Sequence, residues 1–279
     1  MNGKATENGT PTTAAAGAAA SAKDAGAAAK PLSVTMARRQ RVRRALLLAA
    51  LLLFPVTLNY MSPYISIDGA MAGVVSGSLL LFGAQFLTAL VLGRAWCGWL
   101  CPIGGLSETA RAVNDRPVKR RPLAMSRYAV FSVWATVLVL GFVLAGGVRG
   151  VDPFRLTERY ISVDEPMKYI TYYLVLALMG GLTLGLGRRG ACHSVCWMAP
   201  FMTAGYRVGR LLGLPQLRIR SEAERCTDCG TCDRKCPMSL PVNAMRREGA
   251  VRSSDCILCG ECVDGCPQRT LRYGFERRR

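Results

Sequence analysis

Histidine is almost absent from this sequence, which has only His193 among 279 residues. A haem held by two histidines is therefore excluded. Acidic residues are also scarce, since 18 Asp and Glu stand against 36 Lys and Arg, for a formal net charge of +18. Such a balance suits either a nucleic-acid binder or a membrane protein with basic flanks. No nucleic-acid motif accompanies the charge, so we expect no nucleic-acid partner.

Charged residues are missing from four apolar segments, 45–61, 70–92, 128–148 and 169–187. Each is close to the ~20 residues that cross a bilayer as a helix. Because no segment contains a carboxylate or a lysine, a proton pump or ion-coupled transporter is disfavoured. The sequence predicts a mostly α protein with a four-helix transmembrane bundle over residues 38–214, in contact with membrane lipid.

Basic residues flank alternate ends of these segments. Arginines cluster before the first segment, between the second and third, and after the fourth, whereas the other two loops are uncharged, acidic or balanced. By the positive-inside rule, this pattern predicts a multi-pass protein with both termini in the cytoplasm. The first segment resembles a secretory signal, but no small-residue cleavage site follows it, so we expect a retained helix. Residues 1–37, rich in Ala, Gly, Thr and Ser, are expected to be a disordered tail.

Eight of the 12 cysteines lie in the segment 215–279, which reads CTDCGTCDRKCP from Cys226 and CILCGECVDGCP from Cys256. In this bacterial ferredoxin run, three thiolates hold one [4Fe-4S] cluster and the fourth holds the other cluster. The segment is therefore predicted to be a small α+β bacterial 2[4Fe-4S] ferredoxin-like domain. The ligands of cluster 1 would be Cys226, Cys229, Cys232 and Cys266, and those of cluster 2 would be Cys256, Cys259, Cys262 and Cys236. Two zinc sites are the alternative, although zinc ligands usually come as separated CxxC pairs.

The other four cysteines form two pairs with a three-residue gap, Cys97 with Cys101 and Cys192 with Cys196. On a helix or its last turn, residues four apart share a face. Both pairs follow an apolar segment at the same membrane surface, so packing the second segment beside the fourth would bring four thiols together. They could form a third metal or cluster site, act as redox-active dithiols, or only pack as buried cysteines.

The chain combines the four predicted spans and the two-cluster tail with two motifs, CGWLCP from Cys97 and CHSVCWMAPF from Cys192. This combination resembles the NapH/MauN-type ferredoxin-like proteins, membrane-bound components of nitrate reductase and methylamine-utilisation systems. In the second motif, Trp197 stands where the family has proline, which appears here as Pro200. The resemblance implies a quinol dehydrogenase or electron-transfer subunit in the cytoplasmic (inner) membrane of a bacterium or archaeon. Quinol would be its substrate, and a redox or iron–sulfur protein subunit its partner.

Two residues beside the CxxxC motifs are candidates for a quinone site. His193 can exchange protons near neutral pH, although a lone loop histidine usually has no such role. Arg94 lies where interfacial arginines are expected anyway. Two other classes of function stay open: an assembly or regulatory factor for a metalloenzyme, and a passive membrane anchor of a redox complex. Reduction of the clusters by quinol would favour electron transfer over both.

Overall fold

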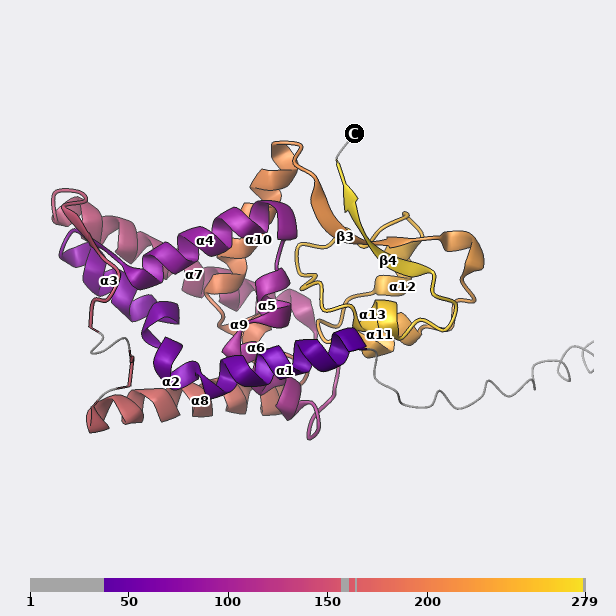
Figure 1. Cartoon of the computed structure of the whole chain (residues 1–279), viewed down its shortest axis with the longest axis horizontal. Coiled ribbons are helices and arrows are strands. Elements are labelled where there is room, and N and C mark those ends of the chain that lie inside the picture. The colour runs from indigo at the N-terminus through magenta and orange to yellow at the C-terminus, as the bar shows by residue number, and fades with distance from the viewer. Residues whose placement is uncertain (1–37, 157–160, 164, 278–279) are drawn as a thin grey trace, which may run out of the picture. The chain divides into compact units, whose positions relative to one another are not determined.

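The computed structural model describes residues 38–156, 161–163 and 165–277. The predicted disordered tail, 1–37, lies outside these residues. All described residues belong to one unit, Ala37–Arg279, which is mostly helical and ends in a small ferredoxin part with two short strands (Figure 1).

Two helices are long and apolar enough to cross a membrane among the described residues. The first, Pro122–Leu144, makes up most of α7 (Arg120–Leu144), and the second is α8 (Pro166–Leu186). Only 17% and 11% of the most apolar 18-residue stretch of each helix is buried inside the protein. Because water is a poor solvent for such apolar faces, these helices indicate association with a membrane.

The other two expected spans are interrupted, so a bundle of four full-length transmembrane helices is not confirmed. Segment 45–61 is divided between α1 (Arg38–Leu52), α2 (Phe54–Thr57) and the 3₁₀ helix η2 (Asn59–Met61). The break falls next to Pro55, whose ring removes a backbone N–H and starts a new helix better than it continues one.

Segment 70–92 is also broken, into the end of α3 (Pro63–Met71), the strand β1 (Val74–Ser76) and α4 (Gly77–Leu92). Gly73 turns the chain between α3 and β1 with a φ of 70°, a conformation that favours glycine. β1 then pairs in parallel with β2 (Gly150–Asp152). Apolar composition alone did not reveal these turns, and the expectation of one continuous helix was wrong.

Four short helices lie around the ends of the long ones. They are α5 (Ala95–Trp99), α6 (Pro102–Ala110), α9 (Gly190–Ser194) and α10 (Met198–Leu211). α10 packs along α4. The long helix α8 contacts α6 and α9. Close approach of α10 requires Gly209, since a Cβ there would overlap the carbonyl oxygen of Leu90. The sequence showed this segment only as a basic loop after the fourth span, so α10 was missed.

The ferredoxin part is built around an antiparallel pair of strands, β3 (Gln216–Ser221) and β4 (Leu271–Glu276), paired from Gln216 with Glu276 to Ser221 with Leu271. Between them lie the 3₁₀ helix η3 (Ala223–Arg225) and the helices α11 (Thr231–Lys235), α12 (Val242–Arg246) and α13 (Glu261–Asp264). α11 and α13 each begin after a glycine in the left-handed conformation, Gly230 and Gly260. This repeat in the backbone matches the duplication of the two cysteine runs.

Candidate iron–sulfur and electron-transfer site

The eight cysteines of the ferredoxin part gather in two groups of four, each lining a small cavity of its own. The inner quartet, which faces the helical part, is Cys236, Cys256, Cys259 and Cys262. The outer quartet is Cys226, Cys229, Cys232 and Cys266. Each quartet has the same four members as one of the two predicted ligand sets, while their ligation of clusters stays a prediction.

The surroundings of both quartets suit metal thiolates. The amide of Leu240 donates to Cys236 Sγ at 3.4 Å, and the sulfurs of Cys229 and Cys266 lie 3.3 Å from the hydroxyls of Thr231 and Thr270. Hydrogen bonds of this kind stabilise cluster sulfur. Burial raises the pKa of Cys256 to about 11, so this thiol is protonated in the free protein and coordination would release its proton.

The two quartets differ in exposure. Cys236, Cys259 and Cys262 are buried, whereas Cys229 is exposed to solvent. The hydroxyl of Thr231 lowers the pKa of the Cys229 thiol, mainly through a side-chain hydrogen bond. The outer quartet is therefore the one that an external protein can approach.

The first CxxxC motif lies directly on the loop of the inner quartet. A Cβ at Gly98 would overlap the carbonyl oxygen of Ile257, so the two backbones touch. Trp99 Nε1 donates to the carbonyl oxygen of Leu258 at 3.0 Å, and Tyr273 Oη donates to the same oxygen at 2.7 Å. The residues between Cys97 and Cys101 thus contact the residues between Cys256 and Cys259.

The two CxxxC motifs lie beside each other, although neither pair lies on one continuous helix. Cys97 is in α5, which ends at Trp99, and Cys101 caps α6; Cys192 is in α9, which ends two residues before Cys196. The pKa of the Cys101 thiol is raised well above its ordinary value, mainly by burial and to a smaller extent by the nearby thiols of Cys97, Cys192 and Cys196. Burial, with smaller effects of Cys192 and Cys97, raises the pKa of Cys196 to about 12. Arg189, three residues before Cys192, donates to the carbonyl oxygen of Cys97, and a Cβ at Gly104 would meet this oxygen, Arg189 Nη1 and Cys101 Cβ, so the two motifs lie beside each other. We call their four cysteines the CxxxC quartet.

The described part of the chain contains no three His, Cys, Asp or Glu side chains drawn together closely enough for a single metal ion. This is true of the ferredoxin quartets as well as the CxxxC quartet.

Buried arginines surround the CxxxC quartet. Arg94 is 1% exposed, and its Nη1 donates to Asp255 Oδ1 at 2.9 Å; Arg127 Nη2 donates to the same oxygen at 3.0 Å. Burial by itself would raise the pKa of Asp255, but Arg94 and Arg127 outweigh it and hold this pKa below its ordinary value. Arg189 is 0% exposed and donates through Nη1 to the carbonyl oxygen of Cys97 at 2.8 Å.

Sequence reasoning placed these residues in the wrong surroundings. Arg94 was expected at the membrane interface and Arg189 in a basic flank, yet both are enclosed by protein. His193 was expected in a surface loop, but it lies in α9 and is 2% exposed. Their quinone role stays a prediction. Asp255, adjacent to Cys256 in sequence, was missed, and no motif singled it out.

The first turns of α1 connect the helical part to the ferredoxin part. Arg43, fully buried, donates to Glu108 of α6 at 2.7 Å and to Glu261 of α13 at 2.6 Å. Gln40 Nε2 donates to the carbonyl oxygen of Cys259 at 2.8 Å and to Asp264 at 2.6 Å. Burial would raise the pKa of Glu108, but Arg43, Arg189 and Arg111 together lower it. We call Gln40 and Arg43 of α1, together with their partners Glu108, Glu261 and Asp264, the α1 clamp.

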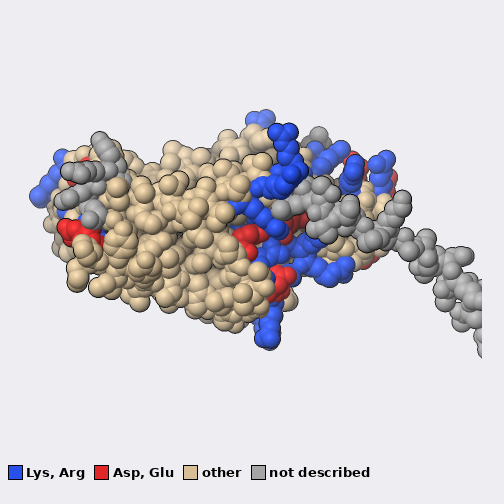
Figure 2. All heavy atoms as spheres, turned by 60° about the horizontal axis from the view of Figure 1, so that its bottom comes forward, with Lys and Arg blue, Asp and Glu red and all other residues tan. Residues whose placement is uncertain are grey.

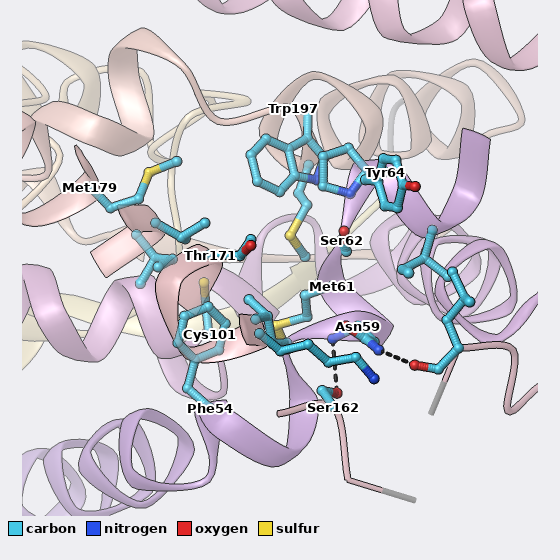
Figure 3. A pocket seen from close by; sticks show the side chains of 18 residues that line it. Phe54, Asn59, Met61, Ser62, Tyr64, Cys101, Ser162, Thr171, Met179 and Trp197 are labelled. Atoms are coloured by element: carbon cyan, nitrogen blue, oxygen red, sulfur yellow. Dashed lines mark hydrogen bonds between the residues drawn. The ribbon is translucent and has the colours of Figure 1, made fainter. Parts of the chain in front are cut away.

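An apolar cavity of about 260 Å³ opens in the helical part (Figure 3). Its wall combines α2, η2 and α3 with α8 and the start of α10, and Asn59 within it is hydrogen-bonded to Ser162 and to the carbonyl oxygen of Leu156. Cys101 of the CxxxC quartet and Trp197, next to Cys196, both form part of the lining, whereas Arg94 and His193 do not.

Together, the paired cysteine quartets and their fold define an iron–sulfur protein of the ferredoxin type. Two family models match the chain: a 4Fe-4S binding domain over residues 76–121 and a 4Fe-4S dicluster domain over residues 225–271. They support two [4Fe-4S] clusters. The only cysteines within 76–121 are Cys97 and Cys101.

The chain belongs to the NapH/MauN-type ferredoxin family. It is 30% identical over 215 residues to the methylamine utilization ferredoxin-type protein MauN of Paracoccus denitrificans, covering 74% of this chain and 70% of that protein. It is 24% identical over 226 residues to the ferredoxin-type protein NapH of Escherichia coli, covering 76% and 74%. The putative electron transport protein YccM of Escherichia coli is 26% identical over 226 residues, which span 77% of this chain and 60% of YccM. No solved structure matches the chain significantly.

Proposed function

We propose that this protein passes electrons between the quinone pool and a partner redox protein, through two [4Fe-4S] clusters in its ferredoxin part. The observation that carries the proposal is the apolar cavity, because one of its walls contains Cys101. That residue belongs to the CxxxC motif that contacts the loop of the inner quartet. A lipid-soluble electron donor bound in the cavity would therefore lie close to the iron–sulfur site.

We propose a multi-pass arrangement in the cytoplasmic membrane, with both termini and the ferredoxin part in the cytoplasm. α7 and α8 would span the bilayer, and the interrupted segments 45–61 and 70–92 would pack beside them. Figure 2 supports this arrangement, because on the face shown the charged side chains gather at two places with a broad uncharged surface between them. Basic residues flank the ferredoxin side, as the positive-inside rule requires for a cytoplasmic surface.

The inner quartet would hold cluster 2 and the outer quartet cluster 1. A [4Fe-4S] cluster supplies one-electron oxidation and reduction at a potential set by its surroundings. The buried thiols of the inner quartet keep water away from one site, and the outer quartet, with Cys229 at the surface, is where the partner would dock.

The crossover of Cys236 and Cys266 can be tested with two matched variants. Cys266→Ser is expected to remove the cluster that a water-soluble iron chelator strips first, because Cys266 lies in the outer quartet. Cys236→Ser should leave that chelator-sensitive cluster and remove the protected one. Iron content and EPR spectra of anaerobically purified full-length protein, before and after chelation, report both. If Cys236→Ser removes the chelator-sensitive cluster instead, the assignment of ligands is wrong.

The cavity is proposed as the quinone site. Quinone-sized ligands are held in mostly apolar pockets with a few polar groups that fix orientation, and here Asn59, Ser62 and Thr171 provide such groups. A quinol bound there would lose two electrons and two protons to become quinone. The electrons would pass one at a time toward the oxidised redox centre of the partner protein, and the protons would leave to water.

Filling the cavity tests this assignment. We expect Val175→Trp, on α8, to raise the quinol KM by about tenfold or more, since forcing a large side chain into an occupied space costs about 1–3 kcal/mol. Iron content and reduction by dithionite should not change. Val139→Trp is the control, because Val139 on α7 is 62% exposed and does not line the cavity. Equal effects of the two variants would place the quinone elsewhere, and clusters that no quinol reduces would favour an assembly factor or an anchor.

A further inference from the structure

We propose that the CxxxC quartet holds a third [4Fe-4S] cluster, with Cys97, Cys101, Cys192 and Cys196 as its four ligands. The thiols arrive from four different places in the chain: α5, the start of α6, α9 and the segment after α9. Three of them are buried, and Cys196 is partly buried. These four cysteines come from two separate motifs, and none of them belongs to either ferredoxin quartet.

The arginines beside the quartet indicate that an anion belongs there. Arg189 is fully buried, yet the only carboxylate oxygen near it among the described residues is that of Glu108 at 3.8 Å, which already accepts from Arg43. Within the described chain, Nε and Nη2 of Arg189 and Nε of Arg94 are buried without a hydrogen-bond partner. Enclosing charged N–H groups without acceptors is strongly unfavourable. A cluster with four thiolate ligands carries net negative charge and presents sulfur acceptors.

Neither simple packing of the thiols nor a disulfide would balance the charge of these arginines. Packing accounts for the contact of Cys97 Sγ with Met202 Sδ at 3.5 Å. Neutral thiols or a disulfide would still leave Nε and Nη2 of Arg189 without acceptors among the described residues, and Nε of Arg94 as well, although Arg94 is also paired with Asp255. Four thiolates around a single zinc ion would also supply negative charge, so metal analysis has to distinguish zinc from a cluster. The family model over residues 76–121 is described as a 4Fe-4S binding domain, and Cys97 and Cys101 are its only cysteines here.

The position of the quartet gives a third cluster a role. Cys101 lines the apolar cavity, and Gly98 touches the loop of the inner quartet. The third cluster would thus stand between the quinone site and cluster 2. This role rests on the proposed function, whereas the existence of the cluster does not.

Iron counting tests the inference directly. Anaerobically purified full-length protein should contain about twelve irons and twelve acid-labile sulfides per chain, since each [4Fe-4S] cluster carries four of each. Cys101→Ser and Cys192→Ser should each lower both counts to about eight, with loss of one EPR signal. Met202→Leu, which alters a neighbour of Cys97 but no thiol, should retain twelve. Wild-type protein with eight irons, with or without one zinc, would overturn the inference even if every variant failed to fold.

The charge argument has its own test. In Arg189→Gln the third cluster should have a lower reduction potential than in the wild type, because the variant loses a positive charge that favours the more negative reduced form. Arg189→Lys keeps the charge and should keep the wild-type potential. An unchanged potential of Arg189→Gln in a redox titration followed by EPR would contradict the argument. A protein with twelve irons that quinol cannot reduce would support the third cluster and overturn the proposed quinol function. A protein with eight irons that quinol does reduce would support the quinol function and overturn the third cluster.

Discussion

Replacing Gly98 with alanine is expected to uncouple the ferredoxin part from the helical part. The new Cβ would overlap the carbonyl oxygen and crowd the carbonyl carbon of Ile257, both backbone atoms that cannot rotate away. The two loops must therefore move apart, at a cost of about 1–3 kcal/mol for overpacking. Reduction of the clusters by quinol should slow markedly, while reduction by dithionite from solution and the iron content stay as in the wild type.

Gly83→Ala is the matched control for this variant. Gly83 lies in α4, and a Cβ there meets no other atom within 4 Å. Alanine is also the better helix former, by up to about 1 kcal/mol. Stopped-flow reduction by a quinol analogue would compare the two. If Gly98→Ala transfers electrons as fast as Gly83→Ala does, the contact between the CxxxC motif and the Ile257 loop is not part of the electron path.

Replacing Arg43 with methionine is expected to give the largest loss of stability. Arg43 is the centre of the α1 clamp and joins Glu108, Glu261 and Gln40 inside the protein. Methionine fills much of the same space but leaves the buried carboxylate of Glu108 without its closest partner, whereas Glu261 keeps Arg111. Removing one member of a buried ion pair typically costs about 3–5 kcal/mol, so the free energy of unfolding of the detergent-solubilised holoprotein should fall by that amount.

The neighbouring arginine provides the comparison. Arg44 also approaches Glu108, at 3.6 Å, but its side chain is 50% exposed. Exposed ion pairs contribute about 0–1 kcal/mol, so Arg44→Met should alter stability by no more than that. Denaturant titrations of both variants, followed by the cluster absorbance, measure the difference. Similar losses for the two variants would mean that the α1 clamp does not hold the two parts together.

The ferredoxin quartets could be written down from the sequence because their ligands are local. Three cysteines of each run lie within seven residues, and the spacing itself fixes which thiol crosses to the other cluster. The two cavities group Cys236 and Cys266 as that crossover predicts, while ligation itself stays a prediction. The CxxxC motifs were expected to meet through helical faces, but helices end between Cys97 and Cys101 and between Cys192 and Cys196.

Other features depend on contacts between distant segments, which residue patterns do not show. An arginine beside an apolar span looks the same whether it faces lipid headgroups, as was expected of Arg94, or a buried carboxylate such as Asp255, which lies 161 residues away. The breaks at Pro55 and Gly73 were hidden for a related reason. Glycine and proline are tolerated in membrane helices, so an apolar run that contains them does not reveal where its helix ends.

Cys229 stands at the surface with a lowered thiol pKa, while most of the inner quartet is buried. Exposed thiolates are the first to react with peroxide and related oxidants. The outer site would therefore be the part of the protein that oxidative stress inactivates first, cutting off the partner while the enclosed metal survives. Recovery would then require rebuilding one surface site rather than refolding and reinserting a whole membrane protein.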